Sequence, residues 1–162
     1  MSSPKFQIVP FHPKFEHQVR DLVGALLVYT GVIPESDLPV DDEDLGRIPE
    51  VYSGKGKFWV AIIGDRVIGT VGIKDEGNNV AKLKRMFVRP EYHGKGVGEA
   101  LLAHAEAYAK KQGFTKLLLN THTKMHRAHH FYEKHGFVHI EEFHCDEQRS
   151  SHCGLHYEKE LL

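Results

Sequence analysis

The sequence has few cysteines, no long apolar run and almost no net charge, and each shortage excludes a class of protein. Two cysteines, Cys145 and Cys153, are too few for a disulfide-stabilised scaffold. Without a recognisable secretory signal, we expect both thiols to be reduced and the protein to be cytoplasmic. No apolar run approaches the roughly 20 residues that span a bilayer. A formal net charge of −1 supplies no basic field, so we expect neither a nucleic-acid nor a membrane partner.

The rest of the composition is that of an ordinary folded domain. The chain has 162 residues, of which 41% are hydrophobic and 27% charged. A chain of this size can bury a core without disulfides or a structural metal, so we expect one domain over residues 1–162 and no metal. A homodimer remains open. Histidine is the exception, because 13 of them make the net charge strongly dependent on pH below about 6.5.

Hydrophobic periodicity predicts a single α/β domain with a mixed sheet. Apolar and β-branched segments predict strands near residues 6–10, 58–63, 66–73, 80–88, 115–121, 137–143 and 155–161. Apolar stripes predict helices at 14–29, 97–112 and 125–135, and a short one within 42–52. Gly64-Asp65 and Gly77-Asn78-Asn79 are typical of tight turns. The unit 80–121 implies a right-handed crossover with parallel pairing, and we expect the strand 115–121 (TKLLLNT) to be buried on both faces.

Residues 30–56 form a long connection that is rich in proline and acidic residues. The carboxylates gather between Glu35 and Asp44, with weak periodicity around them. A loop this long inside a compact domain is typical of a functional or mobile segment. Two interpretations stay open: the acids form a solvated surface, or the segment covers a site that attracts a cationic substrate.

The stretch Met86–Gly98 (MFVRPEYHGKGVG) has the pattern of an anion-binding site. A strand ends there, glycines follow at 94, 96 and 98, and a helical stripe begins at once. The first N–H groups of a helix lack intrahelical partners, the helix dipole adds positive potential, and glycine lets a phosphate approach them. Lys95 precedes Gly96 and not Ser or Thr, which excludes a P-loop, and the glycine spacing does not fit a dinucleotide fingerprint. A turn required only for packing remains the alternative.

The second half of the chain resembles a known family. MFVRPEYHGKGVGEALLAHAEAYAKKQGF followed by AHHFYEKHGF is similar to the GNAT superfamily of acetyl-CoA-dependent N-acetyltransferases, and WVAIIGDRVIGTVGI is similar to its second and third strands. The close match covers about residues 80–140, and the element order agrees over the whole chain. The resemblance implies a mixed sheet of about seven strands with helices on both faces, splayed between the fourth and fifth strands.

The resemblance also implies a cofactor site for acetyl-CoA as co-substrate. Residues 93–98, that is His93, Gly94, Lys95, Gly96, Val97 and Gly98, would bind the pyrophosphate. Met86, Phe87 and Val88 would offer backbone groups to the pantetheine arm. Tyr132 would hydrogen-bond the thioester sulfur and act as general acid, because a phenol with an ordinary pKa near 10 stays protonated at neutral pH. A core tyrosine on an amphipathic helix is the alternative.

Three positions depart from the family pattern. His93 stands where Arg or Gln is usual, Met125 where many members have Asn, and Lys82 where many relatives carry a Glu that activates the amine. Lysine is a poor general base unless its pKa falls by several units. His122, just past the strand 115–121, is the candidate base, because imidazole titrates near neutral pH. A water chain, or no enzymic base, is the alternative.

Several histidines have spacing that suggests a cluster. His126, His129 and His130 share a predicted helix face, and His144, Cys145, His152 and Cys153 flank the last turn. The paired spacing of structural zinc sites is absent, so we expect no metal. We therefore predict an N-acetyltransferase acting on the primary amine of a small cationic or amino-acid-like molecule. A protein N-terminus or lysine as acceptor, a non-catalytic coenzyme A sensor and a metal-binding module are the alternatives.

Overall fold

The computed structural model describes residues 5–40, 42–140 and 154–161. Its strands are β1 (Gln7–Pro10), β2 (Lys57–Ile63), β3 (Arg66–Gly77), β4 (Val80–Val88), β5 (Lys116–Thr121), β6 (Val138–Ile140) and β7 (Leu155–Glu160). Its α-helices are α1 (Glu16–Tyr29), α2 (Ile48–Val51), α3 (Val97–Lys111) and α4 (His126–Lys134). The predicted order of elements is confirmed. The predicted strand 137–143 is observed only as β6, because its later residues lie outside the described ranges.

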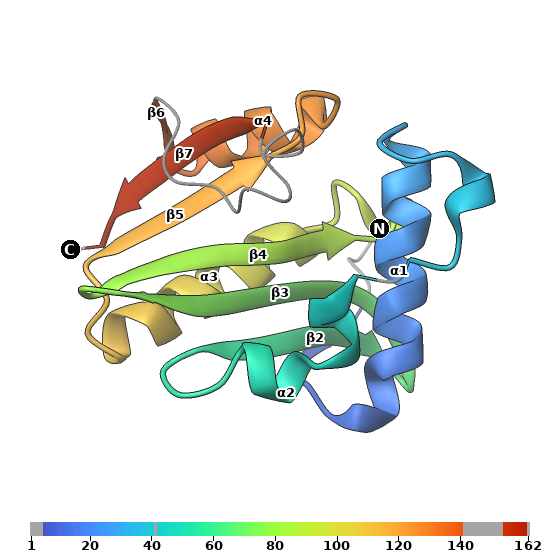
Figure 1. The fold of residues 1–162 in the computed structure, drawn as a ribbon, viewed down its shortest axis with the longest axis horizontal. Helices are drawn as coiled ribbons and strands as arrows, with labels where there is room; N and C mark the ends of the chain where they lie inside the picture. Colours follow the sequence, from blue (N-terminus) through green and yellow to red (C-terminus); the bar gives the residue numbers. More distant parts are fainter. Residues whose placement is uncertain (1–4, 41, 141–153, 162) are drawn as a thin grey trace.

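The strands form one mixed sheet of seven, in the order β1-β2-β3-β4-β5-β7-β6 (Figure 1). All neighbours are antiparallel except β4 and β5, which are parallel and joined through α3. This is the crossover that the sequence predicts, because parallel neighbours need a long connection.

Two cores lie on opposite faces of the sheet. One packs α3 residues such as Leu101 and Ala105 against Ile68, Leu117 and Tyr157. The other packs apolar residues of α1 and the 40–52 segment against the opposite side of β2 and β3. Figure 1 shows α1 and α2 on one side of the sheet and α3 on the other. Helices on both faces are therefore confirmed.

Both predicted hairpin turns are present. Ile63 pairs with Arg66 across Gly64-Asp65, and Gly77 pairs with Val80 across Asn78-Asn79. Both asparagines have positive φ, 55° and 62°, which is the conformation that a two-residue turn between twisted strands requires. These turns set the register that places the side chains of β3 and β4.

The sheet opens between β4 and β5, as expected. Pairing is limited to Val80–Lys82 with Lys116–Leu118, although β4 continues to Val88 and β5 to Thr121. The prediction that 115–121 is buried on both faces is wrong. Leu117, Leu119 and Thr121 are buried, whereas the residues between them are half-buried, because their face of β5 opens where β4 diverges.

No helix among the described residues is both long and apolar enough to cross a membrane. The cytoplasmic location stays a prediction.

Candidate active site

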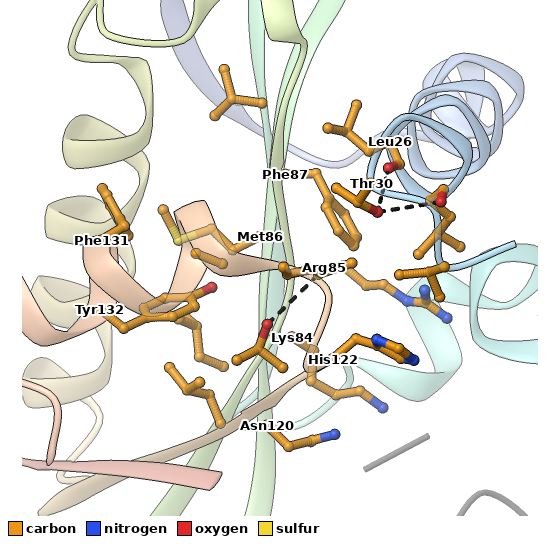
Figure 2. A pocket seen from close by; sticks show the side chains of 18 of the residues that line it. Leu26, Thr30, Lys84, Arg85, Met86, Phe87, Asn120, His122, Phe131 and Tyr132 are labelled. Carbon is orange, nitrogen blue, oxygen red and sulfur yellow. Dashed lines mark hydrogen bonds between the residues drawn. The ribbon is translucent and has the colours of Figure 1, made fainter. Parts of the chain in front are cut away.

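A cleft of about 2130 Å³ opens where β4 and β5 diverge (Figure 2). The C-terminal end of α1, the second half of β4, the end of β5 and α4 line it. The predicted site residues Met86, Phe87, Val88, His93, Gly94, Gly98, His122 and Tyr132 all lie along it. Lys95 and Gly96 are exposed beside it, and Val97 is buried in the core beneath α3.

The glycine loop presents the N-terminus of α3 at one end of the cleft. Gly94 and Gly96 have φ values of 74° and 85°, a left-handed backbone that glycine adopts without strain. Gly96 is the N-cap and offers no side-chain hydrogen bond. The first intrahelical bond runs from the N–H of Ala100 to the oxygen of Gly96, so the three N–H groups between them have no acceptor within the helix. The loop therefore has the features of an anion cradle.

The third glycine of the loop lies close to α4 and β4. A Cβ on Gly98 would lie 3.4 Å from Phe131 and 3.8 Å from the methyl carbon of Met86, which is ordinary van der Waals contact. Gly94 and Gly96 have the positive φ that favours glycine, and Gly98 does not.

His93 ties the loop to the strand before it. Its Nε2–H donates to the carbonyl of Val88 at 2.7 Å, since a carbonyl can only accept, and its ring meets Tyr29 edge-on. The side chain of His93 here holds the loop against β4 and α1.

A β-bulge shapes the part of β4 that faces the opening. Thr70 pairs with Phe87 but Gly72 pairs with Lys84, so β4 carries one extra residue between them. Arg85 has a φ of 53°, an uncommon conformation for a residue with a side chain. Its carbonyl accepts a 2.6 Å hydrogen bond from the hydroxyl of Thr70. Beyond Lys82, the outer edge of β4 has no β5 residue paired with it.

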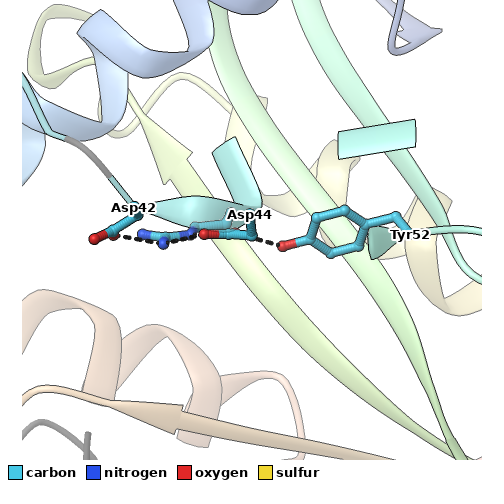
Figure 3. A network of polar contacts seen from close by, with 4 residues as sticks. Asp42, Asp44 and Tyr52 are labelled. Carbon is cyan, nitrogen blue, oxygen red and sulfur yellow. Dashed lines mark hydrogen bonds and ion pairs between the residues drawn. The ribbon is translucent and has the colours of Figure 1, made fainter. Parts of the chain in front are cut away.

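Arg85 is held by two acids of the 35–44 segment. Its guanidinium contacts Asp42 at 2.6 Å and Asp44 at 2.7 and 3.0 Å, and Asp44 accepts a third bond from the hydroxyl of Tyr52 at 3.0 Å. Figure 3 shows Asp42, Asp44 and Tyr52 along this chain of contacts. The side chains of Arg85 and Asp44 are 12% and 11% exposed. Two of the predicted substrate-attracting acids are thus already paired within the protein.

Tyr132 lies on the opposite wall of the cleft. Its ring is buried against Phe131, Phe137 and Tyr157, and only 7% of the residue is exposed. The hydroxyl points toward β4 on the side of Met86 (Figure 2). It makes no hydrogen bond with any described residue, and it is not sealed from solvent. Burial raises the pKa of this phenol well above its ordinary value, which keeps it protonated.

His122 stands at the mouth of the cleft, directly after β5. Its Nδ1 accepts a hydrogen bond from the backbone N–H of Lys124 at 3.1 Å, and its carbonyl accepts one from the ring of His129 at 2.9 Å. A ring that accepts at Nδ1 carries its proton on Nε2 when it is neutral. Met125, where relatives have Asn, contacts the hydroxyl of Thr121 through its sulfur at 3.6 Å.

Two half-buried lysines on β4 complete the wall nearest Arg85. Burial is the largest cause that lowers the pKa of Lys82, with Glu76 opposing it and Lys74 adding to it. Burial likewise lowers the pKa of Lys84 to about 8, against the opposing charge of Asp44. From the sequence, only Lys82 of these two is singled out, because it stands where many relatives carry the Glu that activates the amine. The alternation of Ala81 and Leu83 with Lys82 and Lys84 was the available signal for a basic strand face.

In the parts of the chain that the structure describes, no three His, Cys, Asp or Glu side chains converge as metal ligands. The rings of His126 and His129 do approach each other, at 5.7 Å between centroids. His144, Cys145, His152 and Cys153 lie outside the described residues.

Comparison with known proteins places this cleft in a family context. Residues 25–137 match the acetyltransferase (GNAT) family model. An N-acetylaspartate synthetase of Xenopus tropicalis is 36% identical over 100 residues, which cover 60% of this chain and 37% of that protein. Streptothricin acetyltransferase A of Bacillus subtilis is 36% identical over 98 residues, which cover 60% of this chain and 55% of that protein. Each alignment spans less than two thirds of the relative's own length.

Solved structures share the fold over nearly the whole chain. A GNAT-family acetyltransferase of Staphylococcus aureus superposes with a TM-score of 0.86 and 25% identity, covering 98% of this chain and all of that one. The PaiA N-acetyltransferase of Thermoplasma acidophilum, solved with coenzyme A, has a TM-score of 0.79 and 23% identity, covering 96% and 99%. Because the family model matches most of the sequence and the splayed sheet is present, the protein belongs to the GNAT family of acetyltransferases.

Proposed function

We propose that the protein transfers the acetyl group of acetyl-CoA to the primary amine of a small molecule, by direct attack in a ternary complex. One observation carries the proposal: the glycine loop, the unpaired edge of β4 and the hydroxyl of Tyr132 all face one cleft. Each supplies a different requirement of the reaction, namely an anion cradle, a backbone surface for an extended arm, and a proton donor.

The glycine loop fits the pyrophosphate of coenzyme A. The free N–H groups at the start of α3 and the positive φ of Gly94 and Gly96 suit a close anion, and exposed Lys95 adds a charge. Met86–Val88 fit the pantetheine arm, because an extended chain can hydrogen-bond an open strand edge as an added strand.

The chemistry requires one bond to form and one to break. The neutral amine attacks the thioester carbonyl, a C–N bond forms, and the C–S bond breaks to release a thiolate. Backbone N–H groups near Phe87 and Val88 would polarise the carbonyl, and Tyr132 would supply a proton to the thiolate. Burial raises the pKa of Tyr132, so the phenol is protonated at neutral pH and has a proton to supply.

The proton that leaves the amine still needs an acceptor. His122 remains the candidate base. For this role its Nδ1 must release the hydrogen bond from the Lys124 N–H and accept the proton of the amine instead. Water in the open cleft is the alternative. A pH profile of kcat in a His122→Asn variant tests the assignment, since loss of a base removes the acidic limb of the profile and loss of a loop contact lowers kcat at all pH values.

Of the components of the reaction, the identity of the acetyl acceptor is the one that the cleft constrains least. One relative is named for N-acetylaspartate and the other for streptothricin, so both names indicate small-molecule acceptors. The carboxylates that favoured a cationic acceptor in the sequence now include Asp42 and Asp44, which are engaged by Arg85. That engagement removes much of the argument for a cation.

Thiol release with a panel of amines tests the function. Tyr132→Phe should lower kcat by roughly 10²- to 10⁴-fold, the usual contribution of a general acid, and leave the dissociation constant of coenzyme A within about twofold. Tyr108→Phe is the matched control, because Tyr108 lies on α3 outside the cleft and donates to the carbonyl of Lys55. Tight coenzyme A binding without turnover of any amine would instead support a sensor.

A further inference from the structure

The wall of the cleft formed by β4 and β5 brings polar residues of two strands together. Lys82 and Leu118 are the last pair between these strands, and Lys84 and Asn120 are the next residues on the same face of the sheet, where the strands diverge. Ala81, Leu83, Leu117 and Leu119 point into the core beneath α3. Lys82, Lys84 and Asn120 therefore point to the other face, into the cleft, where Figure 2 shows the amine of Lys84 on the same side of β4 as His122 and Asn120.

This face carries an unusual concentration of positive charge. Lys74 pairs directly with Lys82 across β3 and β4, and Lys84 follows two residues later. All three lysines line the cleft and are half-buried. Like charges directly opposite one another on a sheet are destabilising, and partial burial adds a desolvation cost to each. Glu76 lines the same cleft and offsets part of this cost at Lys82.

Among the described residues, no acid forms an ion pair with the ammonium of Lys84. Both oxygens of Asp44 are bound by Arg85 and Tyr52, and Asp42 is bound by Arg85 as well. The pKa of Lys84 is lowered, with burial as the largest cause; the charge of Asp44 opposes the lowering, and the neighbouring cations Lys82, Arg85 and Lys74 add to it. Glu76 opposes the lowering at Lys82 in the same way. An anionic group that enters the cleft therefore finds in Lys84 an ammonium that no described acid pairs.

We propose that the lysine face formed by Lys74, Lys82 and Lys84 binds a carboxylate of the acceptor, with Lys84 making the contact. The acceptor is then an amino acid that presents its amine to the thioester and its carboxylate to β4. The ammonium of Lys84 disfavours a cation at the same position. This inference rests on the proposed acetyl transfer and narrows its substrate class.

Matched acceptors test the charge requirement. Each amino acid of a panel is compared with its amide, with aspartate against asparagine and glutamate against glutamine for the side chain, and with spermidine as the cationic probe. Removal of the carboxylate that Lys84 binds should raise KM by about 10- to 100-fold, the range expected for one charge-assisted hydrogen bond. Equal KM values for acids and amides, or preference for spermidine, would overturn the proposal.

Substitutions separate anion binding from a role of Lys84 as general base. Lys84→Gln should raise KM for the amino acid by about 10- to 100-fold with little change in kcat, and Lys84→Arg should restore binding because it keeps the charge. Exposed Lys111, at the far end of α3, supplies the control Lys111→Gln with the same loss of charge. Loss of kcat in both Lys84 variants with unchanged KM would show a base and sink the proposal.

Binding measurements keep the inference testable if no acceptor turns over. Calorimetric titration of the wild type with aspartate and glutamate, in the presence of coenzyme A, should give heat that Lys84→Gln abolishes and Lys111→Gln preserves. Binding without turnover would leave the carboxylate site standing while the acetyl-transfer proposal fails. Absence of binding by any acid, with coenzyme A bound normally, would refute the carboxylate site alone.

Discussion

Replacement of Asp44 by Asn should destabilise the protein markedly, because Asp44 is the centre of the network that holds Arg85. Its carboxylate accepts two bonds from Arg85, at 2.7 and 3.0 Å, and one from Tyr52 at 3.0 Å, with 11% of the side chain exposed. An amide keeps one acceptor oxygen and loses the charge. Arg85 keeps Asp42 at 2.6 Å, so it is not left uncompensated.

The magnitude follows from these contacts. Loss of one charge-assisted hydrogen bond costs about 1.5–3 kcal/mol, and breaking a buried pair outright costs about 3–5 kcal/mol. With Asp42 still in place, we expect a decrease in the free energy of unfolding of about 2–3 kcal/mol. For a domain of this size that corresponds to a Tm lower by roughly 4–12 °C.

Urea unfolding measures this directly. The chain's one tryptophan, Trp59, is 2% exposed in the core and reports unfolding by its fluorescence. Glu43→Gln is the control, because the one ion pair of Glu43 with a described residue is solvent-exposed, with Arg47, and its loss should lower the free energy of unfolding by less than about 1 kcal/mol. If Asp44→Asn were no less stable than Glu43→Gln, the network would not be stabilising and the reasoning would fail.

The difference in the free energy of unfolding between wild type and Asp44→Asn should depend on pH in a definite direction. Burial alone would raise the pKa of Asp44, but the hydrogen bonds and charge of Arg85 outweigh it, and the net pKa is lowered. The carboxylate therefore stabilises the fold above its unfolded-state pKa, and this contribution is lost as the pH falls through the lower folded-state value. The gap between wild type and Asp44→Asn should be full at pH 7 and shrink steadily on acidification below about pH 4.

Three further predictions concern the cleft. Gly96→Ala should raise KM for acetyl-CoA by about 5-fold or more, because the φ of 85° strains any side chain by roughly 1 kcal/mol; Gly113→Ala, with a φ of 90° just after the far end of α3 and outside the cleft, is the control for strain alone. The dissociation constant of a carboxylate acceptor should be flat below about pH 8 and rise above it as Lys84 loses its proton, whereas Lys84→Arg should stay flat to pH 9. Asp44, Arg85, Lys74 and Lys82 face Lys84; the first two keep their charge over this window, and Lys82 titrates in the same direction. Thr70→Val should weaken acceptor binding without changing coenzyme A binding, because it removes the 2.6 Å bond to the carbonyl of Arg85 in the bulge; equal losses for both ligands would contradict this.

Local sequence determined the elements and their order. The hairpin turns follow from Gly64-Asp65 and Asn78-Asn79, since a tight turn depends on a few adjacent residues that tolerate positive φ. The glycine loop was predictable for the same reason, as was the position of Tyr132 on a short helix after β5. Periodicity and backbone tolerance act over a few residues, so they can be read from the chain itself.

Contacts between distant segments were not predictable in this way. Asp42 and Asp44 suggested a surface that attracts cations, yet both bind Arg85, which lies 43 and 41 residues later. Arg85 is able to meet them because a bulge in β4 changes the direction of its side chain. No local pattern indicates that bulge, since it arises from the register between β3 and β4.

The sequence by itself therefore determined the family fold and predicted the anion cradle and the proton donor. Tertiary structure decided which charges are left for a substrate. Pairing of the acids with Arg85 and divergence of β5 from β4 leave Lys84 in the open cleft, without an ion pair to any described acid. Charge at a site depends on which groups are already paired, and only the folded chain brings those groups together.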